Sequence, residues 1–156
     1  MPEFTVVPLS EAHIPAAAAL EAECFPDAVS PASFAAFVHA PSNRYFAALL
    51  PDGTPLGYGG YSLAADEAEI LTVAVSPAFR RHGAGRALML VLLRDARSRG
   101  AAHVYLEYRA SNEAARSLYA SLGFTETGRR RNYYSRPRED AVLMALALPV
   151  PEEPEC

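Results

Sequence analysis

The chain has 156 residues, 51% hydrophobic and 21% charged, which is long enough for one domain with its own core and short for two. Its 14 basic and 18 acidic residues give a net charge of -4, so it lacks the positive field that non-specific nucleic-acid binding requires. Two cysteines fit neither a disulfide framework nor a metal-spacing motif. No apolar run approaches the roughly 18 residues of a membrane span. We expect a cytoplasmic protein with no metal, nucleic-acid partner or membrane partner.

The first 40 residues predict a short strand followed by two helices. Residues 4–9 have the composition of a strand, and Ser10 starts an Ala-rich helix that ends before Phe25. The Ser30-Pro31 pair opens the second helix, which we expect to reach Val38.

The next segment predicts a β-hairpin and a further strand. Apolar runs at 44–50 and 56–63 flank residues 51–55, whose Asp-Gly pair tolerates the positive φ of a tight turn. Residues 69–75 are rich in β-branched side chains, and Pro77 closes that strand.

The remaining sequence alternates helices and strands. We expect a long helix over 83–99, a strand over 103–108, a helix over 112–121, a strand from 123 and a last strand over 140–148. This order predicts a mixed α/β sheet with helices on both faces and a right-handed crossover over residues 69–108. We expect one domain over residues 1–148 and a disordered acidic tail over 149–156.

The segment between the strand at 69–75 and the long helix favours anion binding. Gly83 and Gly85 leave backbone amides uncovered at a helix N-terminus, where a pyrophosphate can approach, and arginines add charge. The Lys-Ser/Thr pair of a nucleotide-binding P-loop and the third glycine of the dinucleotide motif are missing. Alone, the two glycines are more typical of a flexible turn into a helix than of a binding site.

Two segments together resemble the GNAT superfamily of N-acetyltransferases. Arg80-x-x-Gly83-x-Gly85 is similar to its coenzyme A motif, and residues 106–124 resemble its second characteristic segment. The resemblance implies a mostly antiparallel central sheet and acetyl-CoA as cosubstrate. It implies pantetheine binding along the strand and a contact from Asn112, which is equally a plain helix cap. The implied cofactor residues are Val73, Ala74, Val75, Arg80, Arg81, His82, Gly83, Ala84, Gly85, Arg86 and Asn112.

The same resemblance assigns proton transfer to Glu107 and Tyr119. Acetyl transfer from a thioester to an amine must remove a proton from the amine and supply one to the thiolate. Glu107 suits the base, directly or through water, and Tyr119 suits the acid. Outside this family context, Glu107 would be read as a solvated strand residue and Tyr119 as part of an apolar helix stripe.

More than half of the chain resembles the RimI-type branch, the ribosomal-protein alanine N-acetyltransferases. The likeness covers residues 66–148 and is strongest at Arg-Arg-Asn-Tyr-Tyr and Arg-Glu-Asp-Ala within 130–146, and Glu107-x-Arg-x-Ser-Asn112 shares it. It implies the α-amine of a protein N-terminus, such as that of a ribosomal protein, as acceptor, with Tyr133 and Tyr134 shaping a peptide groove. The chain departs from the pattern after Phe25-Pro26, where relatives often carry Trp and this chain has none.

Two other functions stay open. A polyamine or aminoglycoside acetyltransferase would need an acidic pocket, which Glu21, Glu23 and Asp27 could form, although a solvated helix face describes them better. A coenzyme-binding module without catalysis is the other, and the presence of Glu107 and Tyr119 argues against it. We assign no role to Arg129–Arg131, and the oligomeric state stays open.

Overall fold

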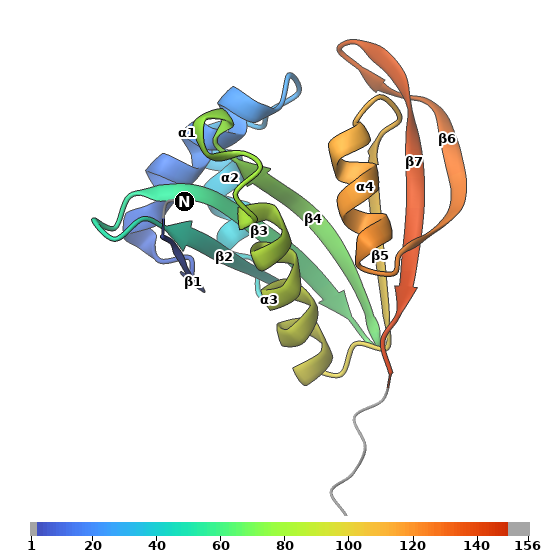
Figure 1. Cartoon of the computed structure of the whole chain (residues 1–156), viewed down its shortest axis with the longest axis horizontal. Helices are drawn as coiled ribbons and strands as arrows, with labels where there is room; N and C mark the ends of the chain where they lie inside the picture. The colour runs from blue at the N-terminus through green and yellow to red at the C-terminus, as the bar shows by residue number, and fades with distance from the viewer. Residues whose placement is uncertain (1–2, 150–156) are drawn as a thin grey trace, which may run out of the picture.

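The computed structural model describes residues 3–149, so all of the predicted acidic tail except Pro149 lies outside the described residues. Within that range the chain forms one seven-stranded sheet with the order β1-β2-β3-β4-β5-β7-β6 (Figure 1). Neighbouring strands are antiparallel except β4 and β5, which are parallel. The predicted mixed, mostly antiparallel sheet is therefore confirmed. The strands are β1 (Thr5–Pro8), β2 (Asn43–Leu49), β3 (Pro55–Ala64), β4 (Glu67–Val75), β5 (His103–Arg109), β6 (Thr125–Ser135) and β7 (Arg138–Ala147).

The α-helices of the described residues follow the predicted order, and each predicted end moves by only a few residues. They are α1 (Ile14–Cys24), α2 (Pro31–His39), α3 (Ala84–Ser98) and α4 (Glu113–Ser121). The start expected at Ser10 is a 3₁₀ turn over Glu11–His13, and the α-helix begins at Ile14 with Pro15 in its first turn. No helix among residues 3–149 is both long and apolar enough to cross a membrane.

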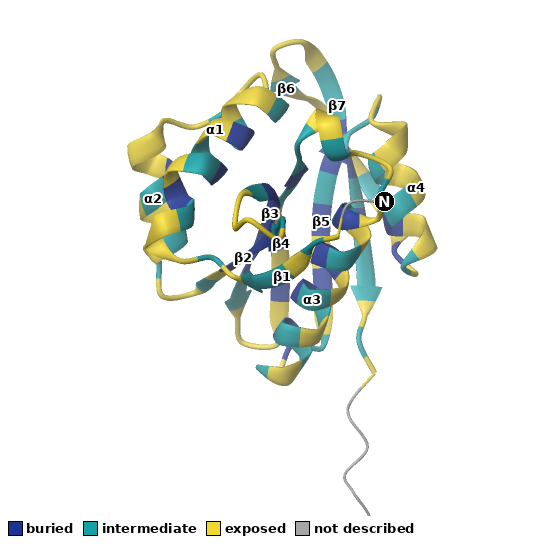
Figure 2. Ribbon diagram, turned by 60° about the vertical axis from the view of Figure 1, so that its left-hand side comes forward, coloured by how far each residue is buried: buried dark blue, intermediate teal, exposed yellow. Residues whose placement is uncertain are grey.

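Helices cover both faces of the sheet, as the sequence predicted. Side chains of β2 alternate between two cores: Tyr45 packs with α1 and α2, whereas Phe46 belongs to the core under α3 and α4. Figure 2 shows the buried residues of α1 and α2 turned toward the strands. Phe34 of α2 meets the Tyr45 and Tyr58 rings edge-on, at centroid distances of 6.0 and 5.2 Å. Both faces of the sheet are therefore covered by helices. A ligand can reach the sheet at its edges or where strands separate.

The sheet opens between its two parallel strands. The β4–β5 ladder pairs Glu67–Glu69 with His103–Tyr105 and extends no further among the described residues. Just beyond, β3 pairs Gly60 with Thr72 and Tyr61 with Ile70, so Leu71 is an extra residue in β4. A bulge of this kind bends its strand, and β4 and β5 diverge from their junction (Figure 1). The gap exposes one backbone edge of β4.

Candidate active site

The loop predicted to bind phosphate leads into α3 as the sequence suggested. Gly83 caps the helix with a left-handed φ of 84°, and Arg81 has a φ of 66°. A Cβ placed on Gly83 would meet nothing within 4 Å, so the space over the helix start is open. The first N–H groups of a helix have no partner within it, and α3 begins at Ala84, directly after this loop.

The arginines around the start of α3 point in different directions. Arg80 donates to the Val75 carbonyl over 3.2 Å, whereas Arg86 donates to Ser121 Oγ of α4 over 2.9 Å. Arg81 is exposed and His82 is half-buried. Arg86 therefore joins the two helices that flank the gap in the sheet.

The β4 stretch predicted to bind the pantetheine arm is paired along one edge. Val73, Ala74 and Val75 pair with Gly59, Tyr58 and Gly57 of β3. On the other side, the β5 ladder has already ended at Glu69. An extended ligand could therefore add to this edge as a strand does.

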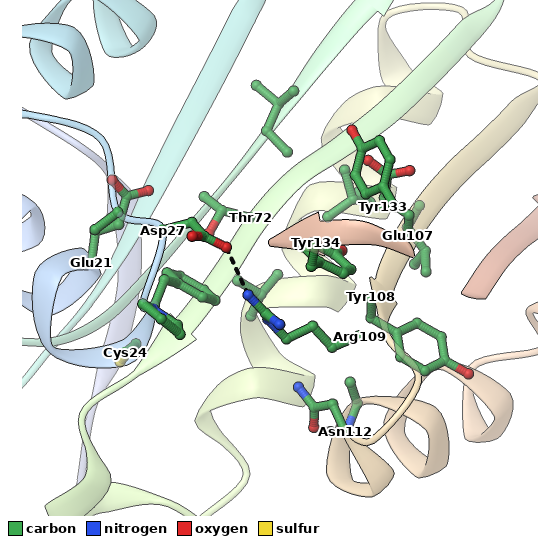
Figure 3. A pocket seen from close by; sticks show the side chains of 18 of the residues that line it. Glu21, Cys24, Asp27, Thr72, Glu107, Tyr108, Arg109, Asn112, Tyr133 and Tyr134 are labelled. Carbon is green, nitrogen blue, oxygen red and sulfur yellow. Dashed lines mark hydrogen bonds and ion pairs between the residues drawn. The ribbon is translucent and has the colours of Figure 1, made fainter. Parts of the chain in front are cut away.

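A cavity of about 560 Å³ occupies the gap. Its lining includes a loop wall, formed by residues 25–29 with Tyr133 and Tyr134, and an α4 wall, formed by Asn112, Ala115 and Tyr119. β4 contributes residues 69–73 and β5 contributes 106–109 (Figure 3). The cavity thus collects Val73, Glu107, Asn112, Tyr119, Tyr133 and Tyr134 of the predicted site. Residues 80–86, at the start of α3, are not part of this lining.

Glu107 faces this cavity from β5, with 27% of its side chain exposed. Its carboxylate lies 3.5 Å from Arg130 Nε. It also lies beside the Tyr133 phenol, whose pKa it raises by hydrogen bonding and by its charge. Arg130 is the middle member of the arginine run to which the sequence assigned no role; its neighbour Arg129 pairs with Glu126 over 3.0 Å instead.

Tyr119 is buried where α4 meets β5. Its ring lies 5.8 Å from that of Tyr108 and 6.0 Å from that of Phe124. Burial raises the pKa of Tyr119 to about 12, and the neighbouring Tyr108 adds to the shift. Tyr119 is thus both a member of the apolar stripe and a protonated phenol at the cavity.

Asn112 serves as the N-cap of α4. Its Oδ1 accepts a hydrogen bond from the Ala115 N–H over 3.0 Å. The residue also lines the cavity (Figure 3). Asn112 is therefore a helix cap, and its position at the cavity also allows it to contact a ligand.

Two of the three acidic residues considered for a polycation pocket line the cavity, and both are engaged by the protein. Glu21 Oε2 accepts from the Val29 N–H over 3.3 Å, and burial raises the pKa of Glu21. Asp27 pairs with Arg109 over 2.7 Å. Glu23 is exposed outside the lining. The three residues do not form a joint acidic pocket.

The sequence reading missed Arg109 and Glu139. Glu139 accepts hydrogen bonds from the Ser111 N–H and hydroxyl, each over 3.0 Å, and from Arg109 over 3.2 Å. These bonds, with those from Ser111 first, lower the pKa of Glu139. Two motifs that resemble the RimI-type branch are therefore in direct contact: Glu-x-Arg-x-Ser-Asn over residues 107–112 and Arg-Glu-Asp-Ala over residues 138–141. The resemblance of both motifs to the same branch was the only sequence feature that could have linked Arg109 with Glu139.

The chain belongs to the Acetyltransferase (GNAT) family, whose sequence profile matches residues 14–124. Over 85 residues it is 51% identical to the [ribosomal protein bS18]-alanine N-acetyltransferase of Escherichia coli (strain K12), covering 53% of this chain and only 57% of that protein. It is 39% identical over 146 residues to the N-alpha-acetyltransferase RimI of Mycobacterium tuberculosis, covering 90% of each. The crystal structure of the ribosomal-protein-S18-alanine N-acetyltransferase from Escherichia coli superimposes with a TM-score of 0.87, at 35% identity and 99% coverage of each chain. The predicted family and branch resemblance is confirmed.

Proposed function

We propose that this protein transfers the acetyl group of acetyl-CoA to the N-terminal α-amine of a protein, of the ribosomal-protein alanine type. The observation that carries the proposal is the cavity between β4 and β5, which gathers Glu107, Tyr119 and the tyrosine pair from three different elements. The names of the relatives described above support the same acceptor class. Such an acceptor would be met in the cytoplasm.

Acetyl-CoA fits the cofactor side of this arrangement. The pyrophosphate would take the open helix start at residues 83–86, where N–H groups and the helix dipole favour anions. Arg80, Arg81 and His82 would flank it. The pantetheine amides would pair with the edge of Val73–Val75 that β5 leaves unpaired, where the Val75 carbonyl also accepts from Arg80. Asn112 would contact the arm from the α4 wall. The thioester would then lie in the cavity near Tyr119 and Glu107.

The acceptor amine would attack the thioester carbonyl directly. Glu107 would take the amine proton, directly or through water, and the Tyr119 phenol would donate to the departing thiolate. An α-amine has a pKa near 8 against about 10.4 for lysine, so deprotonation at neutral pH costs about 3.4 kcal/mol less. A carboxylate base therefore suits an α-amine better than a lysine side chain.

The loop wall supplies the groove for the acceptor peptide. Tyr133 and Tyr134 stack edge-on with centroids 5.2 Å apart, and Tyr133 is 51% exposed. Its ring also faces the Arg130 guanidinium at 5.6 Å. An aromatic pair with one exposed and one half-buried ring, beside a carboxylate, is suited to bind a peptide backbone and its terminal ammonium.

Replacing Gly83 by Val tests the phosphate site. The left-handed φ of 84° disfavours a β-branched residue, so the loop should shift and the branched side chain should obstruct the helix start. We expect acetyl-CoA affinity, measured by calorimetry, to fall about tenfold or more. The matched control is Gly53→Val in the β2–β3 turn, which has a φ of 88° and open space as well. Equal affinity in wild type and Gly83→Val would place the phosphate site elsewhere.

Labelled acetyl-CoA offered with a panel of acceptors tests the reaction. The panel contains peptides that begin with Ala, Ser, Gly or Met, together with polyamines and an aminoglycoside. We expect label on an Ala-terminal peptide and much less on the small amines. Label on polyamines alone would refute the acceptor class, and tight acetyl-CoA binding without any transfer would favour the non-catalytic module.

A further inference from the structure

The most densely bonded side chain at the cavity is one that the proposed chemistry does not use. Arg109, only 18% exposed, donates to Asp27 Oδ2 over 2.7 Å and to Glu139 Oε1 over 3.2 Å. It also donates to the carbonyls of Arg136 over 3.0 Å and Pro137 over 2.9 Å. One guanidinium thus binds four acceptors.

These acceptors belong to separate parts of the chain. Asp27 lies in the α1–α2 loop, 82 residues from Arg109, whereas the Arg136 and Pro137 carbonyls lie in the β6–β7 turn. The guanidinium also lies over the Tyr134 ring, with its carbon 4.4 Å from the centroid. Figure 3 shows Arg109 reaching Asp27 across the cavity.

The segments held by Arg109 adjoin or form the loop wall. Residues 25–29 line the cavity on one side, and Tyr133 and Tyr134, just before the β6–β7 turn, line it on the other. A planar guanidinium fork fixes direction as well as distance. A groove fixed before the ligand arrives avoids the entropy cost of ordering its loops on binding.

We propose that Arg109 is a positioning residue that fixes the loop wall, and that its pair with Asp27 sets the affinity for the acceptor. The inference rests on the proposed function, because it takes the loop wall as the acceptor side. Glu139 is also held by Ser111, so Asp27 is the partner whose loop depends most on Arg109. Loss of the pair should leave the β4 edge and the α3 start unchanged, and acetyl-CoA binding with them.

Two variants test this positioning role by steady-state kinetics. Asp27→Ala removes the ion pair, and Arg109→Lys keeps the charge but loses the fork. We expect each to raise the KM for an acceptor peptide about tenfold, while kcat and the KM for acetyl-CoA stay within about twofold. The double variant should be little worse than Arg109→Lys alone, since the fork that holds Asp27 is already lost in that variant. Arg44→Gln, which breaks the remote Arg44–Asp95 pair at 3.3 Å, is the control and should behave like wild type.

Hydrogen exchange on the free protein separates this inference from the proposed function. Amides of residues 25–29 should exchange faster than in wild type in both variants, whereas those of 133–138 should do so in Arg109→Lys, which also loses the bonds to the β6–β7 turn. The amides of α3 should not change in either variant. Unaltered exchange at 25–29 in Asp27→Ala would overturn the inference, whatever the acceptor. So would Arg109→Lys with wild-type acceptor KM, because charge alone would then suffice. A wild-type protein that acetylates no peptide would instead refute the proposed function, while exchange would still decide whether Arg109 fixes the wall.

Discussion

Glu107→Gln is expected to lower kcat by about 10²-fold or more and to leave the dissociation constant of acetyl-CoA within about twofold. The amide keeps the size of the side chain but cannot accept the amine proton, and removing a general base costs at least this much. Glu107 lies 27% exposed at the cavity, with Arg130 3.5 Å away. Partly exposed ion pairs contribute about 0–1 kcal/mol, so the fold should survive their loss. Single-turnover kinetics with a saturating peptide measure the effect.

Glu126→Gln is the matched control for this substitution. It also removes a carboxylate that pairs with a member of the arginine run, Arg129, over 3.0 Å. Glu126 does not, however, line the cavity between β4 and β5. Wild-type turnover in this control together with a large loss in Glu107→Gln would identify proton transfer as the cause. A Glu107→Gln enzyme that turns over at the wild-type rate would remove Glu107 from the base role.

Tyr119→Phe is expected to lower kcat by about 10²-fold, again with little change in acetyl-CoA affinity. A thiol has a pKa near 8.5, so a phenol with a pKa of about 12 acts chiefly by hydrogen bonding to the departing thiolate. Hydrogen bonds to charged groups contribute about 1.5–3 kcal/mol, which corresponds to roughly 10- to 150-fold in rate. Removing the hydroxyl from a buried ring also leaves the packing against Tyr108 and Phe124 intact.

The pH dependence gives a second readout for Tyr119. Burial favours the neutral phenol and raises its pKa to about 12, so the donor stays protonated as pH rises through 10, where an ordinary tyrosine is half ionised. Between pH 8 and pH 10 we therefore expect no fall in the kcat of the wild type from ionisation of Tyr119. The pH profiles of wild type and Tyr119→Phe should run parallel over this range. Tyr108→Phe, which removes the neighbouring buried phenol at the same cavity, is the control and should keep most of the activity.

The sequence by itself determined the order of elements and the loop at the start of α3, because those signals are local. The Asp-Gly pair predicted the β2–β3 turn, and Gly53 there has a φ of 88°. Ser30 caps α2 by accepting from the Ser33 N–H over 3.1 Å, and Asn112 caps α4. Each depends on residues within a few positions of one another, so composition and spacing sufficed.

Only the tertiary structure decided where the sheet opens and what closes around the opening. Leu71 stands in a strand segment rich in β-branched residues, and nothing in its sequence marks the bulge that bends β4 away from β5. The partners of Arg109 lie 27 to 82 residues away in the sequence. Arg130 belongs to a run of three arginines to which the sequence assigned no role, and only the position of β6 brings it against Glu107. Side chains so far apart in sequence meet through strand register and loop packing, which no local pattern encodes. The chemistry of the site was readable as residue types, but its geometry required the fold.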